Sequence, residues 1–185
     1  FKGNLTLPNS ITTINQSAFQ YCNFTGNLTL PNSITTINQS AFEYCNQFEG
    51  DLTLPNSITT IGTSAFQDCT GFKGNLTLPN SIITIGGWAF SGCTGLTGLY
   101  FSIGIQVTQL YNEVFKGCTE LTGDLDLSGA IKLSNIYYKT FSGCTGFNGD
   151  LCLPDSIRII QHDSFKDCKF SKVITTSSNK ENIKK

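Results

Sequence analysis

Charged side chains are scarce in this 185-residue chain. Lys and Arg (12) nearly balance Asp and Glu (13), which leaves a net charge of −1, and charged residues make up 14% of the total. Such a balance creates no field that would attract nucleic acid or an acidic membrane surface. The first 99 residues carry even fewer charged side chains, and most of their polar positions are Asn, Thr, Ser or Gln. We therefore expect no nucleic-acid partner.

Groups that could act as a general base are equally few. The only histidine is His162, and Asp163 is its neighbour in sequence, but adjacent positions of a turn point apart. No Ser lies in a strained nucleophile elbow. Carboxylates gather in the last two repeats, yet a hard cation needs six or more oxygens, and Asp124 and Asp150 stand where other repeats carry a turn-stabilising Asn. The sequence predicts no enzyme, no metal and no cofactor.

Long apolar runs are also missing. None approaches the roughly 18 residues that a membrane span needs, and no secretory signal precedes the first repeat. Phe1 stands inside a repeat, and the first unit has no polar cap over its open edge. We expect no membrane insertion in this chain, and we expect it to be a fragment of a longer repeat protein.

Repetition is what the chain has in abundance. Each unit reads aromatic or Leu, x, Gly, Asn or Asp, then Leu-x-Leu-Pro-Asn-Ser-Ile, and later Ala-Phe-x-x-Cys. The seven units begin at Phe1, Phe24, Phe48, Phe72, Leu96, Leu121 and Phe147. A fixed period of this length predicts a solenoid, in which each unit buries its apolar side against its neighbours.

The third unit shows what each repeat builds. Residues 52–54 (Leu-Thr-Leu) place two apolar side chains on one face of a short strand and the threonine on the other. Pro55 cannot donate to a ladder and ends the strand. Residues 64–69 predict a helical turn that carries Phe66 and Cys69 inward.

The unit LTLPNSITTIGTSAFQDC, residues 52–69, resembles the repeat of BspA-type, or treponemal-type, leucine-rich repeat surface proteins. The resemblance covers residues 1 to about 176, although units five and six are longer and lack the expected Pro. It implies a curved right-handed leucine-rich-repeat solenoid, and an association with adhesion on the surfaces of bacteria and some protists. We expect this fold to be β-dominated, with short parallel strands plus helical turns.

A single domain is expected. Residues 1–176 form one solenoid of seven repeats plus a terminal strand, because a solenoid grows by adding coils to one core. Residues 177–185 are polar and without period, which predicts a tail.

Seven of the eight cysteines occupy the same slot of each repeat: Cys22, Cys45, Cys69, Cys93, Cys118, Cys144 and Cys168. Neighbours in such a column point the same way, which disfavours disulfide geometry, so we expect a structural ladder of buried thiols, with disulfides or a metal as alternatives. Cys152 takes the outward threonine position. It is expected to be accessible, either by drift from Thr or as a redox or crosslinking thiol.

The candidate binding face is the outward strand column, predicted as Thr6, Thr29, Thr53, Thr77, Ser102, Asp126 and Cys152. Such a column can form a broad protein- or glycan-binding face, can recognise an ordered lattice, or can simply reflect the strand propensity of Thr. Units five and six also carry exposed tyrosines, and Tyr is a frequent interface anchor. A partner site is predicted at Tyr100, Tyr111, Tyr137 and Tyr138.

These observations predict a non-enzymatic recognition or adhesion module, extracellular or at the cell surface. Its partner would be a protein or glycan on a host or neighbouring cell. The alternative is a structural spacer within a larger surface protein, with no ligand of its own.

Overall fold

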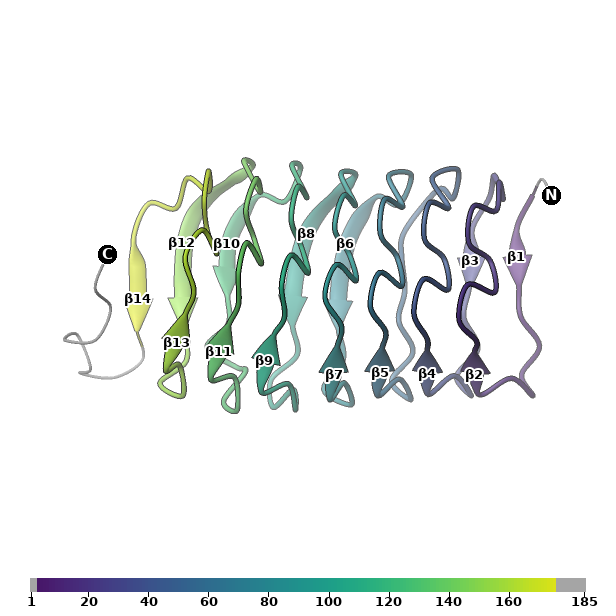
Figure 1. The fold of residues 1–185 in the computed structure, drawn as a ribbon, viewed down its shortest axis with the longest axis horizontal. Coiled ribbons are helices and arrows are strands. Elements are labelled where there is room, and N and C mark those ends of the chain that lie inside the picture. The colour runs from purple at the N-terminus through teal and green to yellow at the C-terminus, as the bar shows by residue number, and fades with distance from the viewer. Residues whose placement is uncertain (1–2, 176–185) are drawn as a thin grey trace.

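The computed structural model describes residues 3–175, which wind into a stack of coils carrying fourteen short strands in two columns (Figure 1). The predicted tail, residues 177–185, lies outside the described residues. One column, here called the LTL strands, consists of β1 (Leu5–Thr6), β3 (Leu28–Thr29), β6 (Gly74–Leu78), β8 (Leu96–Phe101), β10 (Gly123–Asp126), β12 (Phe147–Leu153) and β14 (Val173–Thr175). The other, here called the TI strands, consists of β2 (Thr13–Ile14), β4 (Thr36–Ile37), β5 (Thr60–Ile61), β7 (Thr84–Ile85), β9 (Gln109–Leu110), β11 (Asn135–Ile136) and β13 (Ile159–Ile160).

The two columns lie on opposite sides of the coil. Figure 1 shows the TI strands in front, with the paler LTL strands behind them. All pairings are parallel and join equivalent positions of successive units, such as Leu5 with Leu28 and Ile61 with both Ile37 and Ile85. Residues at equivalent positions of the repeats therefore line up in columns along the stack. The predicted β-dominated leucine-rich-repeat solenoid is confirmed.

The Ala-Phe-x-x-Cys segment differs in detail from the predicted helical turn. No helix occurs in residues 3–175, and this segment consists of consecutive turns. In the third unit Ser64 and Asp68 have φ of 55° and 56°, and left-handed residues at these two points prevent a helical run. The backbone amide of Phe66 donates to the carbonyl of Ala89 in the next unit at 2.8 Å. The turns are therefore tied to the neighbouring coil as well as closed by hydrogen bonds of their own, such as that from the Cys69 amide to the Phe66 carbonyl at 3.2 Å.

Two columns of phenylalanine fill the core. The column from Phe19 to Phe165 stacks nearly parallel rings, for example Phe66 and Phe90 at 5.5 Å with an interplanar angle of 5°. Phe72 of a second column meets Phe66 edge-on at 6.2 Å. The rings of Phe66, Phe72 and Phe90 are fully buried. Offset and edge-on aromatic pairs each add about 0.5–1.5 kcal/mol beyond burial of their area, so these ladders are a main source of cohesion between coils.

The strand ladders are interrupted at defined places. The LTL strands form three separate groups, β1 with β3, β6 with β8, and β10 with β12 and β14. Residues 52–54 of the third unit belong to none of them and are preceded only by an isolated bridge between Asp51 and Lys73. The TI strands divide between β7 and β9. The LTL ladder is thus interrupted on both sides of the third unit and between units five and six, and the TI ladder between units four and five.

Candidate functional site: two faces and a hollow between coils

The outward LTL column is exposed over the first four units. Thr6 pairs with Thr29, and Thr29, Thr53 and Thr77 are all exposed. Its continuation differs from the sequence prediction, because Thr77 pairs with Tyr100. The placement of Ser102 in this column was wrong: it lies beyond β8, and its amide donates to the carbonyl of Leu78 at 3.0 Å.

A register shift explains the error. Between β6 and β8 the pairing moves so that Asn75 lies opposite Gly98, and the fifth unit has no counterpart of that asparagine. Leu99 then takes the inward position beside Leu76, and Tyr100 points outward with 55% of its surface exposed. Further along, Asp126 pairs with Cys152, so the column runs from threonines to Tyr100, Asp126 and Cys152.

The four predicted tyrosines do not form one cluster. Tyr100 belongs to an LTL strand, whereas Tyr111, Tyr137 and Tyr138 follow the TI strands β9 and β11 on the opposite side of the coil (Figure 1). The rings of Tyr111 and Tyr137 stack at 5.8 Å, and Gln109 Nε2 donates to Tyr111 Oη at 2.9 Å. Stacked rings cover each other's faces, so this pair offers ring edges and hydroxyls to a partner.

A histidine that the sequence assigned to a plain turn joins the second tyrosine group. The rings of Tyr138 and His162 are 4.6 Å apart, and Lys139 Nζ lies 4.7 Å from the centroid of the Tyr138 ring. His162 occupies in the seventh unit the position that Tyr138 holds in the sixth. The alignment of the repeats indicates this correspondence.

The cysteine column is held by hydrogen bonds between coils. The thiol of Cys45 donates to the carbonyl of Phe19 at 2.8 Å, and that of Cys93 donates to Phe66 at 3.1 Å. All eight cysteines are free in the structure. Burial raises the pKa of the Cys93 thiol to about 12, so this thiol is a protonated donor at neutral pH.

Cys152 stands apart from that column and is partly exposed. Its pKa is raised by its partial burial and then by the nearby carboxylates, of which Asp126 acts most strongly. A raised pKa lowers the thiolate fraction and hence the reactivity of the thiol. The setting of Cys152 does not activate it as a nucleophile.

Three carboxylates of units six and seven, those of Asp124, Asp126 and Asp150, are already engaged. Asp124 Oδ1 accepts a hydrogen bond from the Asp150 amide at 2.7 Å, and Asp126 Oδ1 accepts one from the Ser128 amide at 2.9 Å. Asp150 also pairs with Lys172 at 3.2 Å. Over residues 3–175, no group of three His, Cys, Asp or Glu side chains is arranged to hold a metal ion.

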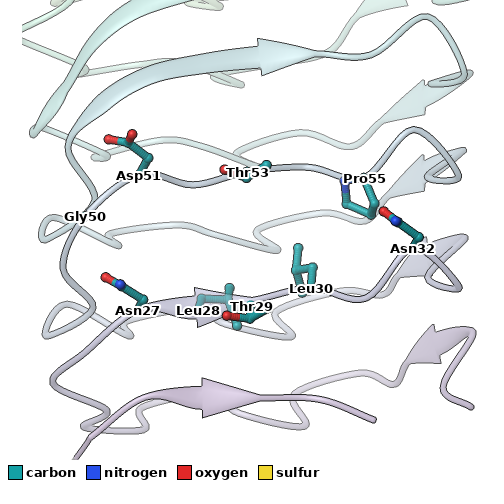
Figure 2. Close-up of a pocket in the computed structure, with 9 residues that line it drawn as sticks. All are labelled: Asn27, Leu28, Thr29, Leu30, Asn32, Gly50, Asp51, Thr53 and Pro55. Carbon is teal, nitrogen blue, oxygen red and sulfur yellow. The ribbon is translucent and has the colours of Figure 1, made fainter. Parts of the chain in front are cut away.

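A hollow lies on the LTL side between the second and third units (Figure 2). It has a volume of about 530 Å³ and is formed where β3 and residues 51–55 run side by side. Asn27 and Asp51 lie at one end, and Leu30, Asn32 and Pro55 toward the other. The hollow cannot be predicted from the sequence, because the residues LTLPNS are the same in each of the first four units.

The fold and its periodic faces define a leucine-rich-repeat solenoid. The chain belongs to the BspA type leucine rich repeat family, whose model matches residues 3–122, 48–145 and 124–185 in 6 copies. No curated protein matches the chain at a significant level.

Solved structures agree with this fold. The chain is similar to the leucine-rich repeat protein TpLRR of T. pallidum, with 23% identity over 76% of each chain and a TM-score of 0.60. A leucine-rich repeat protein of Eubacterium ventriosum shares 17% identity over 98% of this chain and 46% of its own, with a TM-score of 0.53. A leucine rich cell surface protein of Faecalibacterium prausnitzii shares 20% identity over 96% of this chain, with a TM-score of 0.48, and this chain spans 60% of its length.

Residues 3–175 contain no helix of the length and apolar character required to cross a membrane.

Proposed function

We propose that this chain is a non-enzymatic recognition module of a cell-surface repeat protein, which binds a protein or glycan through its LTL face. The observation that carries the proposal is the exposed outward row of Thr6, Thr29, Thr53, Thr77 and Tyr100, in which Thr6 pairs with Thr29 and Thr77 pairs with Tyr100. A solenoid presents such rows as extended surfaces, on which many weak contacts act together. Membership in the BspA type family supports the surface location.

Tyr100 is the strongest single anchor on that face. It is 55% exposed, and no other tyrosine stacks on its ring. Tyr111 and Tyr137 instead cover each other and lie on the other side of the coil. An aromatic side chain with an uncovered face loses little entropy on binding and buries a large area.

A spacer role is the second candidate. It is favoured by the continuous core, because the phenylalanine column links every unit from Phe19 to Phe165 and would keep the array straight and stiff. As a spacer, residues 1–176 would act as one domain that holds another part of the protein away from the surface.

A binding screen separates the two candidates. The chain is tested against immobilised matrix proteins, a glycan array and host cells, beside the variants Tyr100→Ser and Tyr111→Ser/Tyr137→Ser. Saturable binding that is lost in Tyr100→Ser and kept in the double variant supports recognition through the LTL face. Binding that is lost only in the double variant moves the site to the TI side. No binding by a folded sample supports the spacer.

A further inference from the structure

Exposed apolar side chains gather where the LTL segments of the fifth and sixth units end. Ile103 is 86% exposed and Ile131 66%, the two largest values among the large apolar side chains of residues 3–175, and Tyr100 is 55% exposed. In the first four units the turn after the strand reads Pro-Asn-Ser and carries no such side chain. These three residues are here called the Tyr100 patch.

The patch continues across two neighbouring coils. The amide of Gly104 donates to the carbonyl of Gly129 at 3.0 Å, and a Cβ on Gly129 would lie 3.3 Å from the Cα atom of Ile103. Ile131 is two residues beyond Gly129, and Tyr100 is three residues before Ile103. Their Cα atoms therefore lie within about 7 Å and about 11 Å of this contact, respectively. One short segment of a partner can reach all three side chains.

Two carboxylates on β10 lie beside the patch. Asp126 takes in the sixth unit the outward place that Tyr100 has in the fifth, Asp124 belongs to the same strand, and β8 and β10 lie side by side (Figure 1). Both carboxylates accept hydrogen bonds from backbone amides, those of Ser128 and Asp150, which are neutral donors and leave the negative charge in place. Within residues 3–175 neither carboxylate forms an ion pair.

The lysines of this region do not neutralise these two carboxylates by contact. Lys172 pairs with Asp150 at 3.2 Å, and Lys132 donates to the side-chain oxygen of Gln106. A negative potential therefore remains on the outward row, at the side of the Tyr100 patch.

Exposed apolar area next to unpaired negative charge selects the class of partner. Isoleucine forms no hydrogen bond, so a glycan that covered Ile103 and Ile131 would leave hydroxyl groups without partners. The carboxylates would repel the anionic headgroups of a membrane surface. A polypeptide segment with both aliphatic or aromatic side chains and Lys or Arg fits both parts, and the ring of Tyr100 can also receive a cation on its face.

We propose that the Tyr100 patch binds a basic, partly apolar segment of a partner protein, whose apolar side chains cover Ile103 and Ile131 and whose Lys or Arg side chains face Asp124 and Asp126. The inference rests on the proposed recognition function and names the chemistry of its partner. It places the strongest contacts at the end of the LTL strands of units five and six, and gives the threonines of the first four units a minor part.

The probe is a display library of random 12-residue peptides selected on the immobilised chain, and the enriched peptides are then titrated by calorimetry. The variants Tyr100→Ser and Ile103→Ser/Ile131→Ser remove the apolar contacts. Asp126→Asn removes one charge but retains an oxygen acceptor for the amide of Ser128.

Ile83→Ser and Asp163→Asn are the matched controls. Both parent side chains are exposed, and they lie next to the TI strands β7 and β13, on the other side of the coil. Thermal unfolding of each variant verifies that it is folded.

The expected result is enrichment of peptides that combine Lys or Arg with Leu, Ile, Phe or Tyr. Tyr100→Ser and the double isoleucine variant should each weaken their binding about ten-fold or more, as for loss of a buried anchor. Asp126→Asn should weaken it about three-fold or more, with a reduced dependence on salt. The two control variants should bind as the parent does.

Enrichment of acidic peptides, selection of no peptide, equal binding by Tyr100→Ser and the parent, equal losses in the controls, or binding of glycans or lipid vesicles in place of peptides would overturn the inference. So would self-association of the chain that is lost in the double isoleucine variant, because a second copy would then cover the patch. If the peptides fail while a surface partner still binds in a Tyr100-dependent manner, this partner chemistry is excluded and the recognition function stands. If neither is seen, both proposals fail.

Discussion

The thiol of Cys69 donates a hydrogen bond to the carbonyl oxygen of Phe42 at 3.0 Å, across the boundary between two coils. The same carbonyl also accepts the amide of Cys45 within its own unit at 3.1 Å. One carbonyl oxygen therefore accepts a hydrogen bond from the turn of its own unit and another from the thiol of the next unit. This arrangement explains why a residue with a weak donor and a small apolar body recurs in the slot, since alanine would leave the second lone pair without a partner.

Removal of a buried thiol should destabilise the solenoid. We expect Cys93→Ala to lower the free energy of unfolding by about 1–3 kcal/mol, because it leaves a small cavity and removes the hydrogen bond to Phe66. Urea denaturation followed by circular dichroism measures the change. Cys152→Ala, at a partly exposed position, should stay within about 0.5 kcal/mol of the parent. Equal losses of unfolding free energy in the two variants would show that a buried thiol of the cysteine column stabilises the fold no more than the partly exposed thiol of Cys152.

Stability should fall in alkali. Burial raises the pKa of the Cys93 thiol to about 12, whereas the thiol of the unfolded chain ionises near pH 8.5–9. Above that pH the unfolded state binds fewer protons than the folded state, so the free energy of unfolding decreases as pH rises toward 12. A fully buried thiol contributes up to about 1.4 kcal/mol per pH unit to this slope.

The difference between the parent and Cys93→Ala isolates the contribution of one thiol, because the other titrating groups are common to both. Urea denaturation at pH 8, 9, 10 and 10.5 should give a steeper decline for the parent than for the variant. Parallel curves over this range would contradict a buried protonated thiol at position 93.

A glycine in the turn before the second phenylalanine column should not tolerate a side chain. A Cβ on Gly71 would lie 2.0 Å from the carbonyl oxygen of Phe48, which is backbone of the preceding coil and cannot move aside alone. We expect Gly71→Ala to cost about 3 kcal/mol or more, in the range of severe core defects. Thermal and urea unfolding measure it.

Gly104→Ala is the matched comparison for that substitution. A Cβ there meets nothing within 4 Å, and only the φ of 77° opposes it, so the cost should be about 1 kcal/mol. A smaller loss for Gly71→Ala than for Gly104→Ala would mean that the coils separate easily at this contact.

Much of the architecture could be predicted because the period converts position in the unit into position in space. The inward phenylalanines, the outward threonines and the aligned cysteine slot all follow from copying one unit along a stack. The helical turn was predicted because Phe66 and Cys69 have a spacing of three, which consecutive turns share with a helix. The backbone at Ser64 and Asp68 has a positive φ, which cannot be predicted from these residue types.

The candidate sites were harder to predict for two physical reasons. Tyr100 takes the outward place opposite Thr77 because the fifth unit lacks the equivalent of Asn75, and a shift by one residue moves each later side chain to the other face. Ser102 lies beyond the end of β8 and therefore has no place in the row. The hollow at Asp51 arises between units with the same strand letters as their neighbours. Strand pairing depends on how successive coils stack, so local sequence does not distinguish paired from unpaired segments.

The Asn or Asp that precedes the LTL segment, which the fifth unit lacks, occupies the space that a side chain would need on the glycine of the following unit, as Asn4 Oδ1 does only 2.0 Å from a Cβ position on Gly26. A unit that has this residue thus carries a plug on one side and a socket on the other. Where the plug and the socket are both kept, whole units can be gained by duplication or lost by deletion without a change in the interface between units. The length of such an array can therefore drift over evolutionary time while its cross-section, and any surface repeated along it, stays the same.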